Sequence, residues 1–146
     1  MRTHLIIANQ TLASEALLRE VGERIDAGPA RFHVVVPATP PPHGRTAMTW
    51  DEEETWRAAS QRLEAILDWL RERGAEADGE IGDRDPVAAA RDALRRRAVD
   101  EIILSTLPAG TSRWLRQDVV SRLRAAVGVP VTVVTPVAAR IEATAS

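Results

Sequence analysis

The chain has 146 residues, a formal net charge of −2, no cysteine and no lysine. This length predicts one domain with a sizeable core, and the missing cysteine excludes disulfides, thiolate metal sites and a cysteine nucleophile. The missing lysine excludes Schiff-base chemistry and a P-loop lysine, and the small net charge excludes an extended basic surface for nucleic acid.

Short apolar runs alternate with amphipathic segments along the chain. Continuous apolar runs are typical of strands that are buried on both faces, whereas apolar residues spaced three and four apart are typical of helices. We expect strands at residues 5–8, 32–36, 75–82, 102–104 and 131–134. The strand at 75–82 is the weakest, because its alternation is poor and Gly79 interrupts it, so we place it at a sheet edge.

The four intervening segments predict helices with recognisable ends. Gly28 and Gly74 end the first two helices. Thr49 and Glu52 fit a capping box at the start of the second, and Asp85 followed by proline fits the start of the third.

One face of the second helix is apolar and should pack on the sheet. Its members are Trp56, Ala59, Leu63, Ile66, Leu67 and Leu70. His4 and His33 fall within predicted strands, and we expect packing to account for both.

This order of elements predicts an α/β fold of the doubly wound, Rossmann-like type. Right-handed crossovers then give a five-stranded parallel sheet of order 3-2-1-4-5 with helices on both faces. We assign residues 1–136 to the domain and 137–146 to a C-terminal tail, and note a long proline-rich loop at 38–48.

Open α/β sheets bind their ligands at the carboxyl ends of the strands, where the strand order reverses. Strands one and four are neighbours at that point in the predicted order. The candidate ligand-binding residues are Ala8, Asn9, Gln10, Val36, Pro37, Ser105, Thr106, Gly110, Thr111, Ser112 and Asp118.

Several of these residues have a plain structural alternative. Ser105 and Thr106 either bind a ligand or bond the neighbouring loop, and Asn9 either reads a ligand or caps its own turn. Thr111 or Ser112 is expected to cap the fourth helix, a role compatible with anion binding. No catalytic constellation or metal-ligand spacing stands out.

The chain resembles the universal stress protein family over nearly its whole length. The resemblance rests on LIIANQT at the start, RFHVVVPA in the second strand, and the closing segment from DEIILSTLPAG to the strand VTVV. It implies a cytoplasmic homodimer that pairs through Val131–Val134, and a site for adenine nucleotides. The first apolar run is too short for a signal peptide and no run approaches membrane-spanning length, which agrees with a cytoplasmic protein that does not bind membranes.

The chain departs from the pattern of the family's ATP-binding members. They carry an acidic residue where this chain has Asn9, and glycines in the region of Leu107 and Pro108. Bulky residues crowd the approach of phosphate to backbone N–H groups, and Pro108 lacks that donor. Asp118 would add a repelling carboxylate, although arginines flank it.

We therefore expect a divergent universal-stress-like domain with altered or lost ATP binding and an unidentified ligand. An adenine nucleotide or related polar metabolite is one candidate. The alternatives are a dimeric interaction module without a ligand, a standard ATP-binding member of the family, and an enzyme. Only the fold supports the enzyme, and a fold does not establish a function.

Overall fold

The computed structural model describes residues 1–9, 11–37, 52–106 and 113–136. Within these residues, strands and helices alternate strictly along the chain. They are β1 (Arg2–Ile7), α1 (Glu15–Ala27), β2 (Ala30–Pro37), α2 (Glu52–Glu72), β3 (Glu76–Gly82), α3 (Pro86–Arg96), β4 (Glu101–Ser105), α4 (Arg113–Ala126) and β5 (Val131–Val134). The extent of the domain, 1–136, stays a prediction, and the tail at 137–146 and the loop at 38–48 lie outside the described residues.

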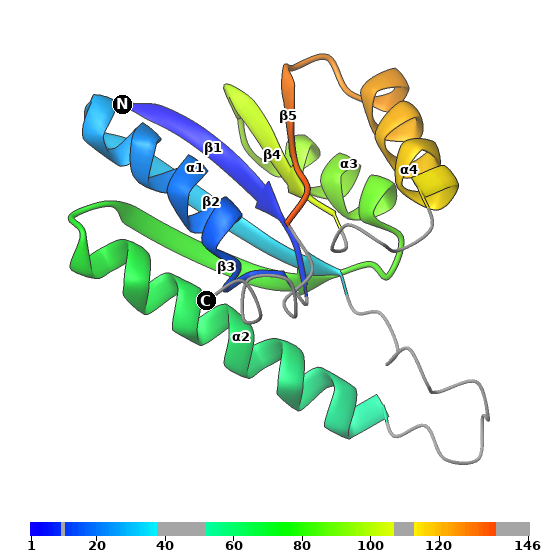
Figure 1. Ribbon diagram of the computed structural model, residues 1–146, viewed down its shortest axis with the longest axis horizontal. Coiled ribbons are helices and arrows are strands. Elements are labelled where there is room, and N and C mark those ends of the chain that lie inside the picture. Colours follow the sequence, from blue (N-terminus) through cyan, green and yellow to red (C-terminus); the bar gives the residue numbers. More distant parts are fainter. Residues whose placement is uncertain (10, 38–51, 107–112, 137–146) are drawn as a thin grey trace, which may run out of the picture.

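All five strands are parallel and lie in the order β3-β2-β1-β4-β5. This confirms the predicted topology, with the weak strand β3 at one edge and β5 at the other. α1 and α2 cover one face of the sheet, and α3 and α4 cover the other (Figure 1).

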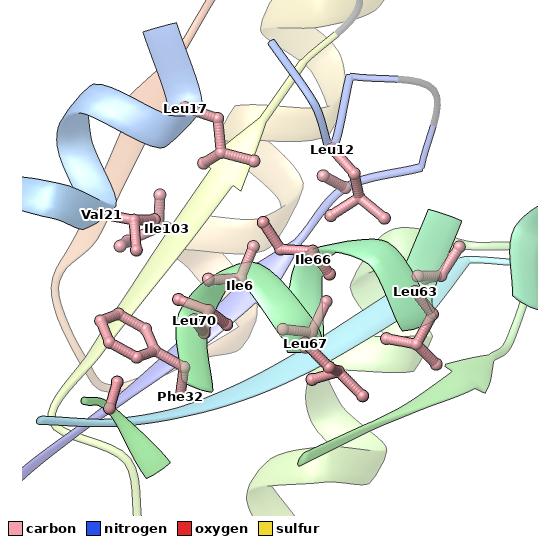
Figure 2. Close-up of a cluster of buried hydrophobic side chains, with 14 of the residues drawn as sticks. Ile6, Leu12, Leu17, Val21, Phe32, Leu63, Ile66, Leu67, Leu70 and Ile103 are labelled. Atoms are coloured by element: carbon pink, nitrogen blue, oxygen red, sulfur yellow. The ribbon is translucent and has the colours of Figure 1, made fainter. Parts of the chain in front are cut away.

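The core has two layers because the central strands bury both of their faces. Along β1, Ile6 packs toward α1 and α2, whereas Leu5 and Ile7 pack toward α3 and α4. Figure 2 shows the first layer, in which Phe32 lies among side chains of the helices and of β1. A strand buried on both faces needs a continuous apolar run, which is the pattern found in the sequence.

The predicted helix ends are confirmed where they lie in the described residues. The Asp85 carboxylate accepts from the backbone N–H of Val87 at 3.1 Å and caps α3. Gly74 follows α2 with φ of 90°, a left-handed conformation that favours glycine. Thr49 of the predicted capping box lies outside the described residues, although Glu52 does begin α2.

The placement of Trp56 on the packed face of α2 was wrong. Its side chain is 58% exposed, whereas Ala59 and Leu70 are fully buried. The reason is length: 21 helical residues span about 32 Å, while the eight residues of β2 span about 26 Å. The first turn of α2 therefore extends past the sheet (Figure 1).

Gly79 has a clearer role than interrupting β3. A Cβ atom at this position would lie 2.6 Å from the carbonyl oxygen of Val34 and 2.7 Å from Leu63 Cδ1. The missing side chain therefore lets α2 pack closely against the edge of the sheet.

Candidate functional site

The carboxyl ends of β1 and β4 lie side by side, since Ile7 pairs with Leu104 in the sheet. Just beyond this pair, the hydroxyls of Thr11 and Ser105 are 2.7 Å apart and share a hydrogen bond. Both residues are buried. The bond joins the loop after β1 to the end of β4 at the predicted switch point of the sheet.

Asn9 connects three elements through its side chain. Its Nδ2 donates to the carbonyl of Pro37 at 2.7 Å, and its Oδ1 accepts from Arg62 Nη1 at 2.7 Å. Its backbone carbonyl also accepts from the N–H of Leu12 at 3.2 Å, which closes a turn. The carboxamide thus joins the ends of β1 and β2 to α2, and its role toward a ligand stays a prediction.

Thr106 holds the ends of β4 and β5 together. Its backbone N–H donates to the carbonyl of Val134 at 2.9 Å, and its hydroxyl lies 3.0 Å from the hydroxyl of Thr135. Both Ser105 and Thr106 therefore bond their neighbours, which is one of the two roles considered for them. Contact with a ligand stays a prediction.

The remaining candidates divide into three groups. Ala8 and Val36 are buried at the strand ends, and Asp118 is exposed on α4, where its carboxylate lies 3.9 Å from Arg122. Gln10, Gly110, Thr111 and Ser112 lie outside the described residues. Six of the predicted residues thus lie at the carboxyl ends of β1, β2 and β4: Ala8, Asn9, Val36, Pro37, Ser105 and Thr106.

The opposite end of the sheet carries a charged cluster that sequence reasoning missed. Glu101 accepts from Arg24 Nη2 at 2.7 Å, from the hydroxyl of Thr132 at 2.8 Å, and lies 2.8 Å from His4 Nδ1. Arg24 also pairs with Glu20 at 2.6 Å. The cluster joins α1 to the starts of β1, β4 and β5.

The charges of this cluster depend on one another. The hydrogen bond from Arg24 outweighs the cost of burial and lowers the pKa of Glu101 to about 2. The same bond raises the pKa of Arg24, so this pair stays ionised. Burial lowers the pKa of His4, whose ring stacks on Phe32 with centroids 5.0 Å apart.

A second charged cluster surrounds His33 on the α3 side of the sheet. Its Nδ1 lies 2.9 Å from Asp78 Oδ1 and its Nε2 lies 2.9 Å from Glu80 Oε2. The hydrogen bond from Arg96 is the main reason that the pKa of Glu80 is lowered. Packing alone therefore does not account for either strand histidine.

Strand register was the signal that could have found both clusters. His4 is paired with Glu101, and His33 is paired with Asp78. His4 and Glu101 each stand directly before the apolar run of a central strand. Aligning these runs as neighbouring parallel strands would have brought the two polar residues together.

Other site types receive no support in the part of the chain that the structure describes. Its His, Asp and Glu side chains form no group of three that could hold a metal ion. None of its helices is long and apolar enough to cross a membrane.

Comparison with known proteins finds the same architecture. A universal stress protein from Archaeoglobus fulgidus superposes with a TM-score of 0.64 at 15% identity, covering 92% of this chain and all of that one. A universal stress protein family member from Arabidopsis thaliana, with AMP bound, gives 0.60 at 15% identity and covers 94% of both chains. A universal stress protein from Archaeoglobus fulgidus in complex with dAMP gives 0.59 at 18% identity, covering 92% of this chain and 98% of that one.

This chain has the universal stress protein fold. The match extends over more than nine-tenths of the chain, in agreement with the resemblance seen in the sequence. No family model matches the sequence, and no curated protein matches it. At these identities the likeness to universal stress proteins establishes the fold, and the ligand has to be argued from the site.

Proposed function

We propose that this chain is a cytoplasmic, universal-stress-like regulatory domain that binds a small polar ligand at the switch point of its sheet. The ligand class we favour is an adenine nucleotide or a related metabolite, bound with altered or lost affinity for ATP. The observation that carries this proposal is the likeness in fold to proteins whose structures hold AMP and dAMP. Ligands of open α/β sheets bind at this end of the strands.

Two departures from the family's ATP-binding members bear on which ligand would fit the switch point. Asn9 stands where ATP-binding relatives carry an acid, and it is held by Arg62. Leu107 or Pro108, depending on the offset, stands where those relatives carry glycine, and backbone N–H groups cradle phosphate best when no side chain crowds them. The lost glycine supports weaker contacts to a triphosphate than to a nucleoside or monophosphate.

Isothermal titration of metabolite-free protein with ATP and AMP tests the proposal. We expect AMP to bind more tightly than ATP, and Ser105→Ala to weaken AMP binding about tenfold, because a hydroxyl at the strand end is lost. Ser121→Ala, which removes an exposed hydroxyl on α4, is the matched control and should bind as the parent does. Absence of heat with either nucleotide at millimolar concentration would remove the adenine-nucleotide assignment.

The second candidate is a homodimeric interaction module, with or without a ligand. β5 is an edge strand with three partly exposed residues, Val131, Thr132 and Val133. The carbonyls of Pro130 and Val134 accept hydrogen bonds from the N–H groups of Ile102 and Thr106. Because alternate residues of a parallel strand bond the same neighbour, the backbone N–H of Val133 points away from β4. An unpaired strand edge favours pairing with a second chain.

Val133→Pro tests that interface, since proline removes the outward N–H and leaves the bonds to β4 in place. We expect the parent to sediment as a dimer at micromolar concentration and Val133→Pro to sediment as a monomer with an unchanged circular dichroism spectrum. A monomeric parent would exclude this dimer. We assign no catalysis, because a nucleotide hydrolase would rest on the fold alone.

A further inference from the structure

A groove lies between α1 and α2, separate from the switch point of the sheet. Its volume is about 480 Å³, within the range of small-molecule sites in proteins. Apolar side chains from the loop after β1 and from both helices line most of it, including Leu12, Leu18, Ile66 and Trp69. Figure 2 shows Leu12 facing α2 across from Ile66, and these two buried side chains join the groove to the core.

The α2 wall of the groove is a second stripe beside the buried one. The α2 residues that line the groove are spaced mostly three and four apart, so they share one face of the helix. They are residues 58, 61, 62, 65, 66 and 69. Ala58 and Ala65 are small and leave space along it. Ala65 is exposed and Trp69 is only partly buried, so the described part of the chain leaves this stripe open.

Trp69 gives this wall a fixed shape. The guanidinium of Arg73 lies over its ring, 3.8 Å from the centroid, and the ring also packs against the core. The groove therefore has a largely preformed apolar surface.

Arg62 is the one charged residue among the described residues that line the groove, and it is only partly exposed. Its Nη1 donates to the amide oxygen of Asn9, and no carboxylate of the described residues lies within ion-pair distance of it. A guanidinium has five N–H donors in a planar fork that matches a carboxylate. An apolar groove with one cationic side chain on its wall is complementary to a molecule with an apolar body and one anionic head.

We propose that this groove binds a small carboxylate with an aliphatic or aromatic body, with the carboxylate on Arg62 and the body along Leu18, Ile66 and Trp69. The proposal does not depend on nucleotide binding at the switch point. It does connect the two places, because the guanidinium that binds the carboxylate also donates to Asn9 Oδ1.

The experiment is titration of the full chain with octanoate, with octanol and octylamine as probes of the same length. Methyl and indole NMR signals of Leu12, Leu18, Ile66 and Trp69 report the site. We expect octanoate to shift these signals, octanol to bind about tenfold more weakly, and octylamine to bind more weakly still. Nucleotide is left out, so failure of the proposed function does not affect the result.

Two variants and one control decide the assignment. Arg62→Gln should weaken octanoate about tenfold and leave octanol unchanged, and Ala65→Leu should fill the groove and weaken both. Arg57→Gln removes an exposed arginine of the same helix that does not line the groove, and should leave both affinities unchanged.

Equal losses in Arg62→Gln and Arg57→Gln, or shifts confined to other parts of the chain, would overturn the proposal. Octanoate binding that appears only after removal of residues 137–146 would also overturn it, and would assign the groove to that segment of the chain. Binding that appears only on dilution would do the same, and would assign the groove to a second copy of the chain.

Discussion

The cluster around Glu101 makes acid stability the sharpest prediction of this structure. The carboxylate is 11% exposed and accepts hydrogen bonds from Arg24 and Thr132. Its pKa falls from an ordinary value of 4.5 to about 2, which corresponds to about 3 kcal/mol of stability. Because the folded pKa is the lower one, this contribution is complete above pH 4.5 and is lost as the pH falls toward 2.

Glu101→Gln should therefore destabilise the fold by about 3 kcal/mol near neutral pH, since it leaves Arg24 partly buried beside Glu20 alone. For a domain of this size the melting temperature should fall by about 10 °C. Urea unfolding followed by circular dichroism measures the difference, which should shrink as the pH is lowered below 4.5.

The control for this substitution is Glu76→Gln. Glu76 also pairs with an arginine, Arg31, at 2.9 Å, but its side chain is 58% exposed. An exposed pair of this kind contributes less than about 1 kcal/mol. Equal losses in the two variants, or a Glu101→Gln deficit that does not change with pH, would refute the reasoning about the buried cluster.

Three further predictions concern single positions. Burial lowers the pKa of His4, so the stability that the neutral imidazole contributes is complete above pH 6.5 and is lost as the pH falls below it. His4→Gln should therefore flatten the stability–pH curve below pH 6.5, which urea midpoints measured across that range will show. Gly79→Ala should cost about 1–3 kcal/mol in thermal unfolding, because its Cβ would meet Val34 and Leu63 inside van der Waals distance. Gly22→Ala, inside α1 with nothing within 4 Å of the added carbon, should stabilise the protein by up to about 1 kcal/mol in the same assay.

The sequence could predict the sheet order because the signals for it are local. Each strand is an apolar run of a few residues, each helix has its own periodicity, and Asp85 and Gly74 mark ends at fixed offsets. The edge position of β3 followed from its weak pattern, and the structure agrees. Trp56 was misplaced because periodicity reports which face of a helix is apolar and not how far the sheet beneath it extends.

The polar groups of the site could be predicted in part. Asn9 and Ser105 could be predicted because each follows the end of an apolar run, and the carboxyl ends of strands in an α/β sheet meet where ligands bind. Their partners Arg62 and Thr11 depend on how α2 and the loop after β1 are placed in space. The ion pairs of His4 and His33 depend on register between strands that are far apart in sequence, so they follow only from aligning whole strands with one another and not from a local pattern.

The two ends of the sheet differ in how their polar groups respond to pH. The amino ends hold the ionised Glu101–Arg24 pair, whose contribution changes with pH. At the carboxyl ends of β1, β4 and β5 the described side chains are amides and hydroxyls, Asn9, Thr11, Ser105, Thr106 and Thr135, which do not titrate. Acid therefore acts on the charged pair at the amino ends and not on these groups, so any loss of a neutral ligand at low pH should follow the unfolding curve.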